Sequence, residues 1–279
     1  MSTLCGIHIL DDPTVSPRLR SFLSQRARRH PPTPADRFTH YTPTVDDTGF
    51  KPPTGPGIVD AMIRFEERYG GLSYSPRGGN ASEYGLDGAP SAHWTSHGWA
   101  FPGILDGPGT YRLDVLADGR TAIPVPGLTH RLINSSVDQR LEADALLAGV
   151  YRWPHLVLRT ATPLGVAPSV AEEHLPPRVR EATGPADMWW SDDRSAFHLE
   201  LYSWWTPRTT CDTWIVRCFA VDGEALGRAA SVLRAAVPGL TGAHFDWCSL
   251  CRRGVDTGEL CLPTVRGGPP GPPGGAEGE

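Results

Sequence analysis

The chain has 279 residues, and Gly 31 and Pro 28 together make up about a fifth of it, against roughly one-eighth in an average protein, so the sequence predicts many turns. Hydrophobic residues make up 39% and charged residues 20%, which is enough apolar material for a core and excludes wholesale disorder. The net charge of −5 disfavours a nucleic-acid-binding surface, and no apolar run approaches the roughly 18 residues that a membrane-spanning helix needs.

The N-terminus has no basic region before its short apolar patch, and two Asp follow that patch directly. It therefore does not resemble a secretory signal, and the sequence predicts a cytoplasmic protein. Because that compartment keeps thiols reduced, we expect the six Cys to be free thiols or metal ligands rather than disulfides.

Residues 1–56 are predicted to hold one N-terminal helix and a Pro-rich strap. Ser16 suits the N-cap of that helix and Pro17 its first position. The Arg cluster within the helical region favours a solvated helix face over a phosphate-binding helix; its members are Arg18, Arg20, Arg26, Arg28 and Arg29. The strap from residue 30 to residue 56 has many Pro and no apolar period.

Residues 57–160 are predicted to form a core of helices and strands. Apolar spacing indicates a helix over 58–69 that ends at Gly70-Gly71, followed by a short strand over 72–74. A second extended piece is expected at 94–99, and a hairpin over 110–125 turns at Asp118-Gly119. Ser136 and Gln139 form a capping box for a later helix.

The rest of the chain is divided into a linker, a further unit and a tail. Residues 161–188 are irregular and predict a linker. Residues 189–266 predict an α+β unit with strands at 196–205, 214–221 and 243–248 and a helix at 223–237. Residues 267–279 contain few residue types and predict a disordered tail.

Cys248 and Cys251 form the only CxxC motif, which can hold one zinc ion. Completing a four-ligand site would need Cys211, Cys218 or Cys261. The spacing is not that of a zinc ribbon, and a Cys on an apolar strand is more often a small core residue. The sequence therefore predicts neither a metal nor a cofactor, with this zinc site as the open alternative.

His198 and Glu200, upstream of Cys248 and Cys251, form a pattern similar to the zinc-deaminase signature. In that chemistry the His-x-Glu pair opens a helix and a Pro precedes the first Cys. Here the pair shares one face of a predicted strand, and Trp247 stands at the Pro position. A zinc-dependent nucleotide or nucleic-acid enzyme is therefore kept only as an alternative.

His93 and His97 have i, i+4 spacing, but no Glu follows His93 as a helical zinc-protease motif requires. The nearby Gly and Pro argue against a helix, so we expect both imidazoles to face solvent or pack on aromatic rings. The chain has no nucleophile elbow, Walker loop or dinucleotide-binding fingerprint, and the sequence predicts no catalytic residue.

The doublets Trp189-Trp190 and Trp204-Trp205 are the sequence's candidates for a partner-binding surface. Adjacent strand residues face opposite ways, so each doublet exposes one indole unless both faces of its strand are covered. An exposed Trp is a typical interface anchor.

Four segments of the core resemble the SUKH superfamily, also called SMI1/KNR4-like. They are FEERYGGL at 65–72, DGPGTYRLD at 106–114, the Asp118-Gly119 turn, and SVDQRLEAD at 136–144. The resemblance covers about a third of the chain and rests on turns rather than on chemical groups. It implies an α+β fold with a curved, mostly antiparallel sheet and flanking helices. Two alternatives stay open for the C-terminal unit: it extends this sheet, or it forms a second domain.

The same resemblance implies a function: an intracellular immunity protein that binds and neutralises a polymorphic toxin. The net negative charge suits a basic, nuclease-like toxin domain as the protein partner. The sequence thus predicts a non-enzymatic protein-binding module, and a scaffold protein outside toxin biology is a further alternative, because a fold does not define a function.

Overall fold

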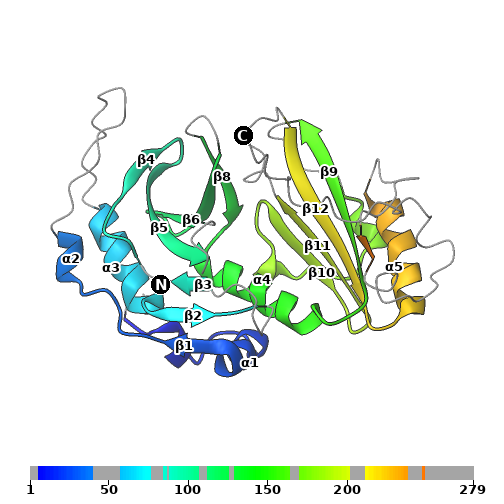
Figure 1. Ribbon diagram of the computed structural model, residues 1–279, viewed down its shortest axis with the longest axis horizontal. Coiled ribbons are helices and arrows are strands. Elements are labelled where there is room, and N and C mark those ends of the chain that lie inside the picture. The colour runs from blue at the N-terminus through cyan, green and yellow to red at the C-terminus, as the bar shows by residue number, and fades with distance from the viewer. Residues whose placement is uncertain are drawn as a thin grey trace, which may run out of the picture.

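The computed structural model describes residues 6–39, 57–76, 84–86, 88–106, 112–125, 129–163, 170–201, 211–237 and 247–248. The strands pair in antiparallel fashion and, with the helices, form an α+β fold with two curved sheets (Figure 1). The predicted fold class is confirmed. No helix within the described ranges has the length and apolar character that a bilayer span requires.

The N-terminal helix begins where its cap signals predict. Helix α1 (Pro17–Arg26) follows Ser16, whose Oγ accepts a hydrogen bond from the Leu19 backbone N–H. A 3-10 turn (Ile9–Asp11), strand β1 (Ala27–Arg29) and helix α2 (Asp36–Thr39) complete this region. Most of the predicted strap, residues 40–56, lies outside the described residues.

Helix α3 (Gly57–Tyr69) ends at the predicted Gly70-Gly71 turn and leads into β2 (Leu72–Tyr74). Gly71 has a φ of +73°, which residues with a side chain rarely adopt. A Cβ at this position would also lie 2.1 Å from the His30 carbonyl oxygen. Because the His30 N–H donates to the Gly71 carbonyl oxygen at 2.7 Å, this close approach joins the end of β1 to the start of β2.

The first sheet has eight strands in the order β1-β2-β3-β5-β6-β7-β8, with β4 paired to the first part of β5. The strands not yet given are β3 (Tyr84–Leu86), β4 (His93–Thr95), β5 (Gly98–Asp106), β6 (Arg112–Leu116), β7 (Thr121–Val125) and β8 (Thr129–Asn134). Strands β6 and β7 are the predicted hairpin, with Gly119 at φ +90° in its turn. The sheet curls until the turn after β4 meets β8, where His97 Nε2 donates to the His130 carbonyl oxygen at 3.0 Å.

Helix α4 (Val137–Val150) begins at the predicted capping box, where the Ser136 Oγ accepts a hydrogen bond from the Gln139 N–H at 3.1 Å. Leu141 packs into the main hydrophobic core, whereas Leu146 packs into a second cluster with Trp189 and Phe219. A helix with apolar residues on opposite sides must be covered on both. Accordingly, α4 lies between the two sheets (Figure 1).

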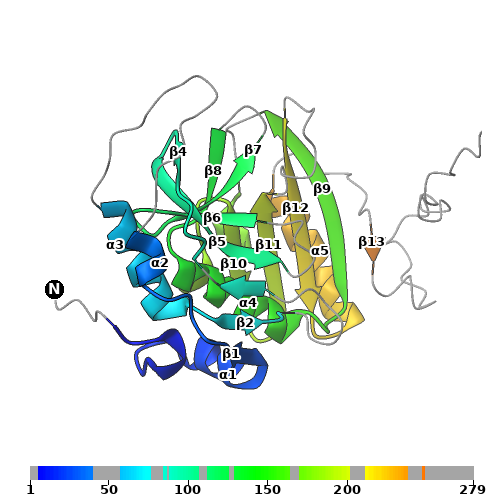
Figure 2. The same ribbon diagram turned by 60° about the vertical axis from the view of Figure 1, so that its left-hand side comes forward.

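The second sheet has the order β10-β11-β12-β9-β13. Its strands are β9 (His155–Pro163), β10 (Asp187–Ser191), β11 (Ser195–Leu201), β12 (Cys211–Ala220) and β13 (Trp247–Cys248). The C-terminal strands therefore do not extend the first sheet: they form a sheet of their own, which also takes in β9. Helix α5 (Gly223–Ala236), capped by Asp222, covers its outer face (Figure 2).

The segment before β10 connects the two sheets. It contains 3-10 turns at Glu172–His174 and Arg180–Ala182. The Ala186 N–H donates to the Ile133 carbonyl oxygen of β8, and the Leu201 N–H of β11 donates to the Ala186 carbonyl oxygen. Part of the predicted 161–188 linker is thus hydrogen-bonded to both sheets.

Candidate functional site

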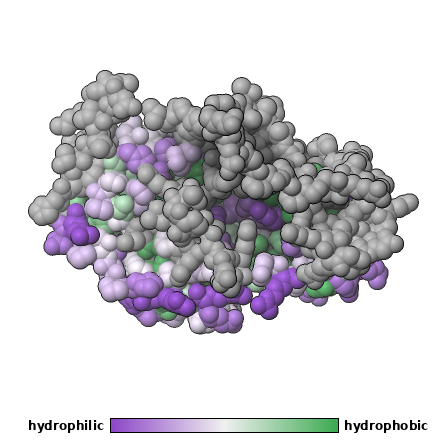
Figure 3. Space-filling view, viewed as in Figure 1, coloured by the Kyte–Doolittle hydropathy of each residue, from purple (hydrophilic) through white to green (hydrophobic). Residues whose placement is uncertain are grey.

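Hydrophilic residues gather along the lower edge of the face seen in Figure 3, where Figure 1 shows α1 and β1. These two elements carry the Arg cluster. Arg18 forms an ion pair with Glu142 at 2.9 Å, and Arg29 forms one with Asp11 at 3.0 Å. Guanidinium groups that are already paired within the chain attract a phosphate less strongly. This arrangement supports the predicted solvated helix face rather than a phosphate-binding helix.

Trp189 and Trp190 are both buried, with 0% and 2% of their surface exposed. Trp189 packs in the cluster beside α4, and Trp190 packs in the main core on the other side of β10. The idea that this doublet exposes one indole for a partner is wrong, because both faces of the strand are covered. Trp204 and Trp205 lie outside the described residues.

His198 and Glu200 share one face of β11, as predicted, and their Nε2 and Oε2 atoms lie 3.5 Å apart. The His198 Nε2 donates to Asp187 Oδ1 at 2.8 Å, and its Nδ1 lies 3.1 Å from the Arg217 guanidinium. Both ring nitrogens are thus engaged by the protein, and Trp189 stacks on the ring at 4.0 Å. Among the described residues, no group of three metal-ligating side chains forms around His198, which disfavours the zinc site that a deaminase needs.

The charged network around His198 binds three parts of the fold together. Asp187 accepts a hydrogen bond from Asn134 of β8 at 3.2 Å, and Arg140 of α4 pairs with Asp144 at 3.1 Å. Tyr74 of β2 donates to Asp144 at 2.8 Å. The network therefore links both sheets through α4, which is a structural role.

Two carboxyl groups of this network have opposite pKa shifts. Burial would raise the pKa of Glu200, but the neighbouring charges of Arg217 and His198 outweigh it and lower the pKa to about 2. Burial raises the pKa of Asp144, and the Arg140 charge only partly offsets it. The Glu200–Arg217 pair, 2.8 Å apart, is thus the firmly ionised end of the network.

Cys218, one of the five candidate zinc ligands, lies in the apolar core at 0% exposure. Burial raises the pKa of its thiol, which disfavours the thiolate that a metal requires. Leu156 of β9 stands between Cys218 and Cys248 in the sheet register, so the two Cα atoms are about two strand spacings apart, or roughly 10 Å. The side chains of Cys211, Cys248, Cys251 and Cys261 lie outside the described part of the structure.

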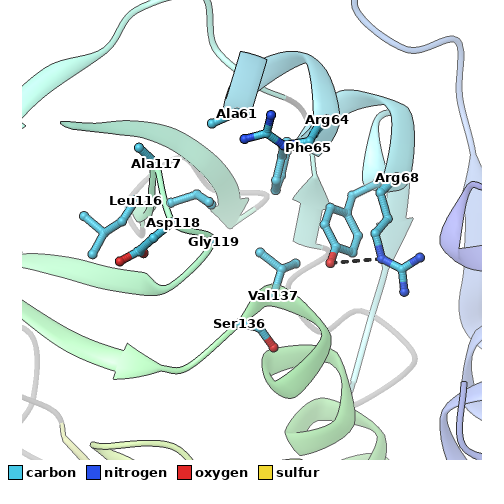
Figure 4. Close-up of a pocket in the computed structure, with 12 residues that line it drawn as sticks. Ala61, Arg64, Phe65, Arg68, Leu116, Ala117, Asp118, Gly119, Ser136 and Val137 are labelled. Carbon is cyan, nitrogen blue, oxygen red and sulfur yellow. Dashed lines mark hydrogen bonds between the residues drawn. The ribbon is translucent and has the colours of Figure 1, made fainter. Parts of the chain in front are cut away.

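A surface pocket of about 220 Å³ opens where α3, the β6–β7 turn and the start of α4 meet (Figure 4). These elements carry three of the four segments of the SUKH resemblance. The walls are mainly apolar and include Phe65, Leu116 and Val137. Arg64 extends from α3 over the opening, and Asp118 lies on the opposite side at the hairpin turn.

One wall of the pocket is fixed by Arg68 and Tyr69. The Arg68 guanidinium pairs with Asp138 at 2.8 Å and with Asp12 at 3.0 Å, and the Tyr69 hydroxyl donates to Asp138 at 2.7 Å. Burial, and then the Asp138 charge, raise the pKa of Tyr69, so this phenol is protonated and serves as a hydrogen-bond donor. The pocket therefore has one rigid polar wall, held by α3, α4 and the N-terminal turn.

The structure also brings together a cluster that the sequence did not indicate: His93 of β4, Asp114 of β6 and His130 of β8. His93 Nε2 and His130 Nε2 lie 3.0 Å and 2.9 Å from Asp114 Oδ2. Residues 93–95 form a strand rather than a helix, as expected. His93 is 28% exposed and packs on the His130 ring with centroids 5.4 Å apart, in line with the expectation, but its contact with Asp114 was not predicted. No local spacing could have indicated this cluster, because its members come from three separate strands.

Comparison with protein-family models, with curated proteins and with solved structures gave no match for this chain.

Proposed function

We propose that this chain is a non-enzymatic protein-binding module, which acts in the cytoplasm as an immunity protein that neutralises a toxin. The observation that carries the proposal is the pocket between α3, the β6–β7 turn and α4 (Figure 4). Segments that resemble one family and lie far apart in the sequence converge on a single surface opening. A binding face built from those segments is consistent with the binding role that the resemblance implies.

The chemistry of the pocket suits a protein side chain. Apolar walls with charged groups at the rim match the usual anatomy of an interface, in which a buried apolar centre has a polar border. We expect a partner to insert one apolar side chain between Phe65, Leu116 and Val137 and to meet Arg64 and Asp118 at the rim.

The charge of the chain favours a basic partner. Its net charge is −5, and a toxin domain that acts on nucleic acid is expected to be basic because it must attract the negatively charged phosphates. Opposite net charges raise the rate of association even where they add little to affinity. A basic toxin domain is therefore the partner that we propose.

The alternative of a zinc-dependent enzyme is less well supported. It requires His198 as a metal ligand and Glu200 as a proton carrier, yet both nitrogens of His198 are engaged and Glu200 is paired with Arg217. The remaining alternative is a scaffold protein outside toxin biology, which would use the same pocket for a different partner. The co-expression test below distinguishes this alternative from the immunity function.

The proposal predicts that a toxin gene lies next to the gene of this chain, and the test is co-expression of the full chain with the protein that such a gene encodes. We expect the two proteins to co-purify and growth to be restored. The variant Ala117→Glu places a charged side chain in the pocket wall. Its matched control is Ala148→Glu, since Ala148 is also partly buried against the main core but lies 11 residues along α4 from Val137, about 16 Å away.

We expect Ala117→Glu to lose both co-purification and rescue, while Ala148→Glu retains them, with circular dichroism to establish that both variants fold. Equal behaviour of the two variants would remove the pocket from the proposal. Failure of the unmodified chain to bind or to protect would favour the scaffold alternative.

A further inference from the structure

The cluster of His93, Asp114 and His130 lies on three strands that are not hydrogen-bonded to one another. In the first sheet β5 separates β4 from β6, and β7 separates β6 from β8. The side chains meet because the sheet curls, which the hydrogen bond from His97 to the His130 carbonyl oxygen stabilises. The carboxylate of Asp114 is completely buried at their meeting point.

The three polar atoms lie close enough together to bind one metal ion. Asp114 Oδ2 lies 3.0 Å from His93 Nε2 and 2.9 Å from His130 Nε2, and the two nitrogens are 3.5 Å apart. Ligands at about 2.0–2.1 Å from a tetrahedral zinc ion are separated by about 3.3–3.4 Å. The distance between the two nitrogens agrees with this spacing, whereas the two nitrogen–oxygen distances are those of hydrogen bonds and would lengthen by about 0.4 Å on zinc binding.

Hydrogen bonding alone accounts for only part of this geometry. The three distances make the angle at Oδ2 between the two nitrogens about 70°, whereas donors that use separate lone pairs of one carboxylate oxygen prefer about 120°. If both nitrogens donate to Asp114 Oδ2, two hydrogen-bond donors lie only 3.5 Å apart, which is unfavourable. An ion bound to all three atoms gives a direct reason for that approach.

The burial of the rings points to one open side. The His130 side chain is 7% exposed and that of His93 is 28% exposed, so the cluster is reached from the side of His93. The His130 Nδ1 is buried and has no partner among the described residues, so the polar contacts of this ring are concentrated at Nε2. A metal-bound imidazole usually donates its other N–H to a neighbour. Because His130 Nδ1 has no such partner among the described residues, we expect the metal affinity to be about 10–100-fold lower than that of a site with this support.

We propose that His93 Nε2, Asp114 Oδ2 and His130 Nε2 hold one Zn²⁺ ion, with water in the fourth position. Two imidazoles and one carboxylate are ligands that zinc accepts. Three protein ligands with a water are the arrangement typical of catalytic zinc sites, whereas structural sites usually have four protein ligands, so the ion proposed here keeps one exchangeable position. The ion joins β4, β6 and β8 and so stabilises the curl of the first sheet. Because the three ligands come together only in the folded chain, its binding energy adds to folding stability.

The test uses the full chain, stripped with a chelator and then titrated with ZnCl₂ in a calorimeter. We expect one ion per chain at this site and a higher melting temperature with zinc. His93→Ala is the first variant, since this side chain is partly exposed, and Asp114→Asn is the second, since it keeps the side-chain shape. Each is expected to weaken zinc binding by about tenfold or more, since loss of a supporting partner alone costs that much. Each also removes the zinc-dependent rise in melting temperature.

Two controls separate this site from other zinc ligands of the chain. His174→Ala removes an exposed imidazole remote from the cluster and should bind zinc as the unmodified chain does. Cys248→Ser with Cys251→Ser removes the CxxC motif, and titration with Co²⁺ should then give a spectrum without thiolate charge-transfer bands. The proposal is overturned if the unmodified chain binds no zinc, if His93→Ala and Asp114→Asn both bind it normally, or if the CxxC variant abolishes all binding.

Discussion

Trp189 lies almost parallel to His198, with ring centroids 4.0 Å apart and an interplanar angle of 13°. The two residues are directly opposite each other in the register of β10 and β11. The indole therefore covers the imidazole at the centre of the charged network that links the two sheets. A side chain considered as a partner anchor is instead part of the interior.

This burial predicts a large loss of stability on truncation. Trp189→Ala should lower the free energy of unfolding by about 3–5 kcal/mol, as large-to-small aromatic changes in a core do. The matched control is Trp94→Ala, because Trp94 is 43% exposed, and we expect it to change the same quantity by less than about 1 kcal/mol. Urea unfolding followed by circular dichroism measures both, and similar values for the two variants would contradict the assignment of Trp189 to the core.

The Glu200–Arg217 pair predicts a pH dependence of stability. The pKa of Glu200 falls from its ordinary 4.5 to about 2 in the folded chain, so the ionised pair stabilises the fold above pH 4.5. That contribution, on the order of 3 kcal/mol, is lost as the pH falls from 4.5 towards 2. The difference in free energy of unfolding between the unmodified chain and Glu200→Gln should therefore shrink over this interval.

The control for this experiment is Glu224→Gln, which removes a carboxylate from the exposed surface of α5. Surface ion pairs contribute little to stability, so we expect Glu224→Gln to change the free energy of unfolding by less than about 1 kcal/mol at both pH 7 and pH 3. A difference between Glu200→Gln and the unmodified chain that is the same at pH 7 and pH 3 would show that Glu200 is not the titrating group.

Alanine substitution is expected to cost different amounts of stability at Gly71 and at Gly119, which both have a positive φ. Gly119→Ala meets no atom within 4 Å and should cost about 1–2 kcal/mol, which is the conformational cost of φ +90°. Gly71→Ala pays a similar cost and in addition meets the His30 carbonyl oxygen at 2.1 Å. The melting temperature of Gly71→Ala, measured by thermal denaturation, should therefore be clearly lower than that of Gly119→Ala. The reverse order would contradict the contact between β1 and β2.

The burial of Cys218 predicts an unreactive thiol. Burial raises its pKa, and alkylating reagents attack the thiolate, so Cys218 should stay unmodified by iodoacetamide in the folded chain and react fully after denaturation. Peptide mapping by mass spectrometry measures modification at this position alone. Rapid alkylation of Cys218 in the native chain would mean that β12 opens.

Much of the local structure could be predicted from neighbouring residues. The caps at Ser16 and Ser136, the end of α3 at Gly70-Gly71 and the hairpin turn at Asp118-Gly119 all follow from interactions within a few residues. Such signals act through backbone hydrogen bonds of short range. They define where elements begin and end, but not which faces are later covered.

The candidate site was less predictable. Three segments of the pocket carried the family-like turns, so its components were visible in the sequence, although their convergence was not. The His93 cluster had no local signal at all, because the i, i+4 spacing of His93 and His97 points to a helix whereas the chain forms a strand and a turn there.

By itself, the sequence determined the α+β class, the helices α1, α3, α4 and α5 and the β6–β7 hairpin, because short-range hydrogen bonding and apolar periodicity are encoded residue by residue. It did not indicate the strands β1, β8, β9 and β10. The tertiary structure alone decided that α4 lies between two sheets, that Trp189 and Trp190 are both covered, and that Asp114 meets His93 and His130. These outcomes depend on how sheets curl and pack around a shared core, and that is set by contacts between residues remote in the chain.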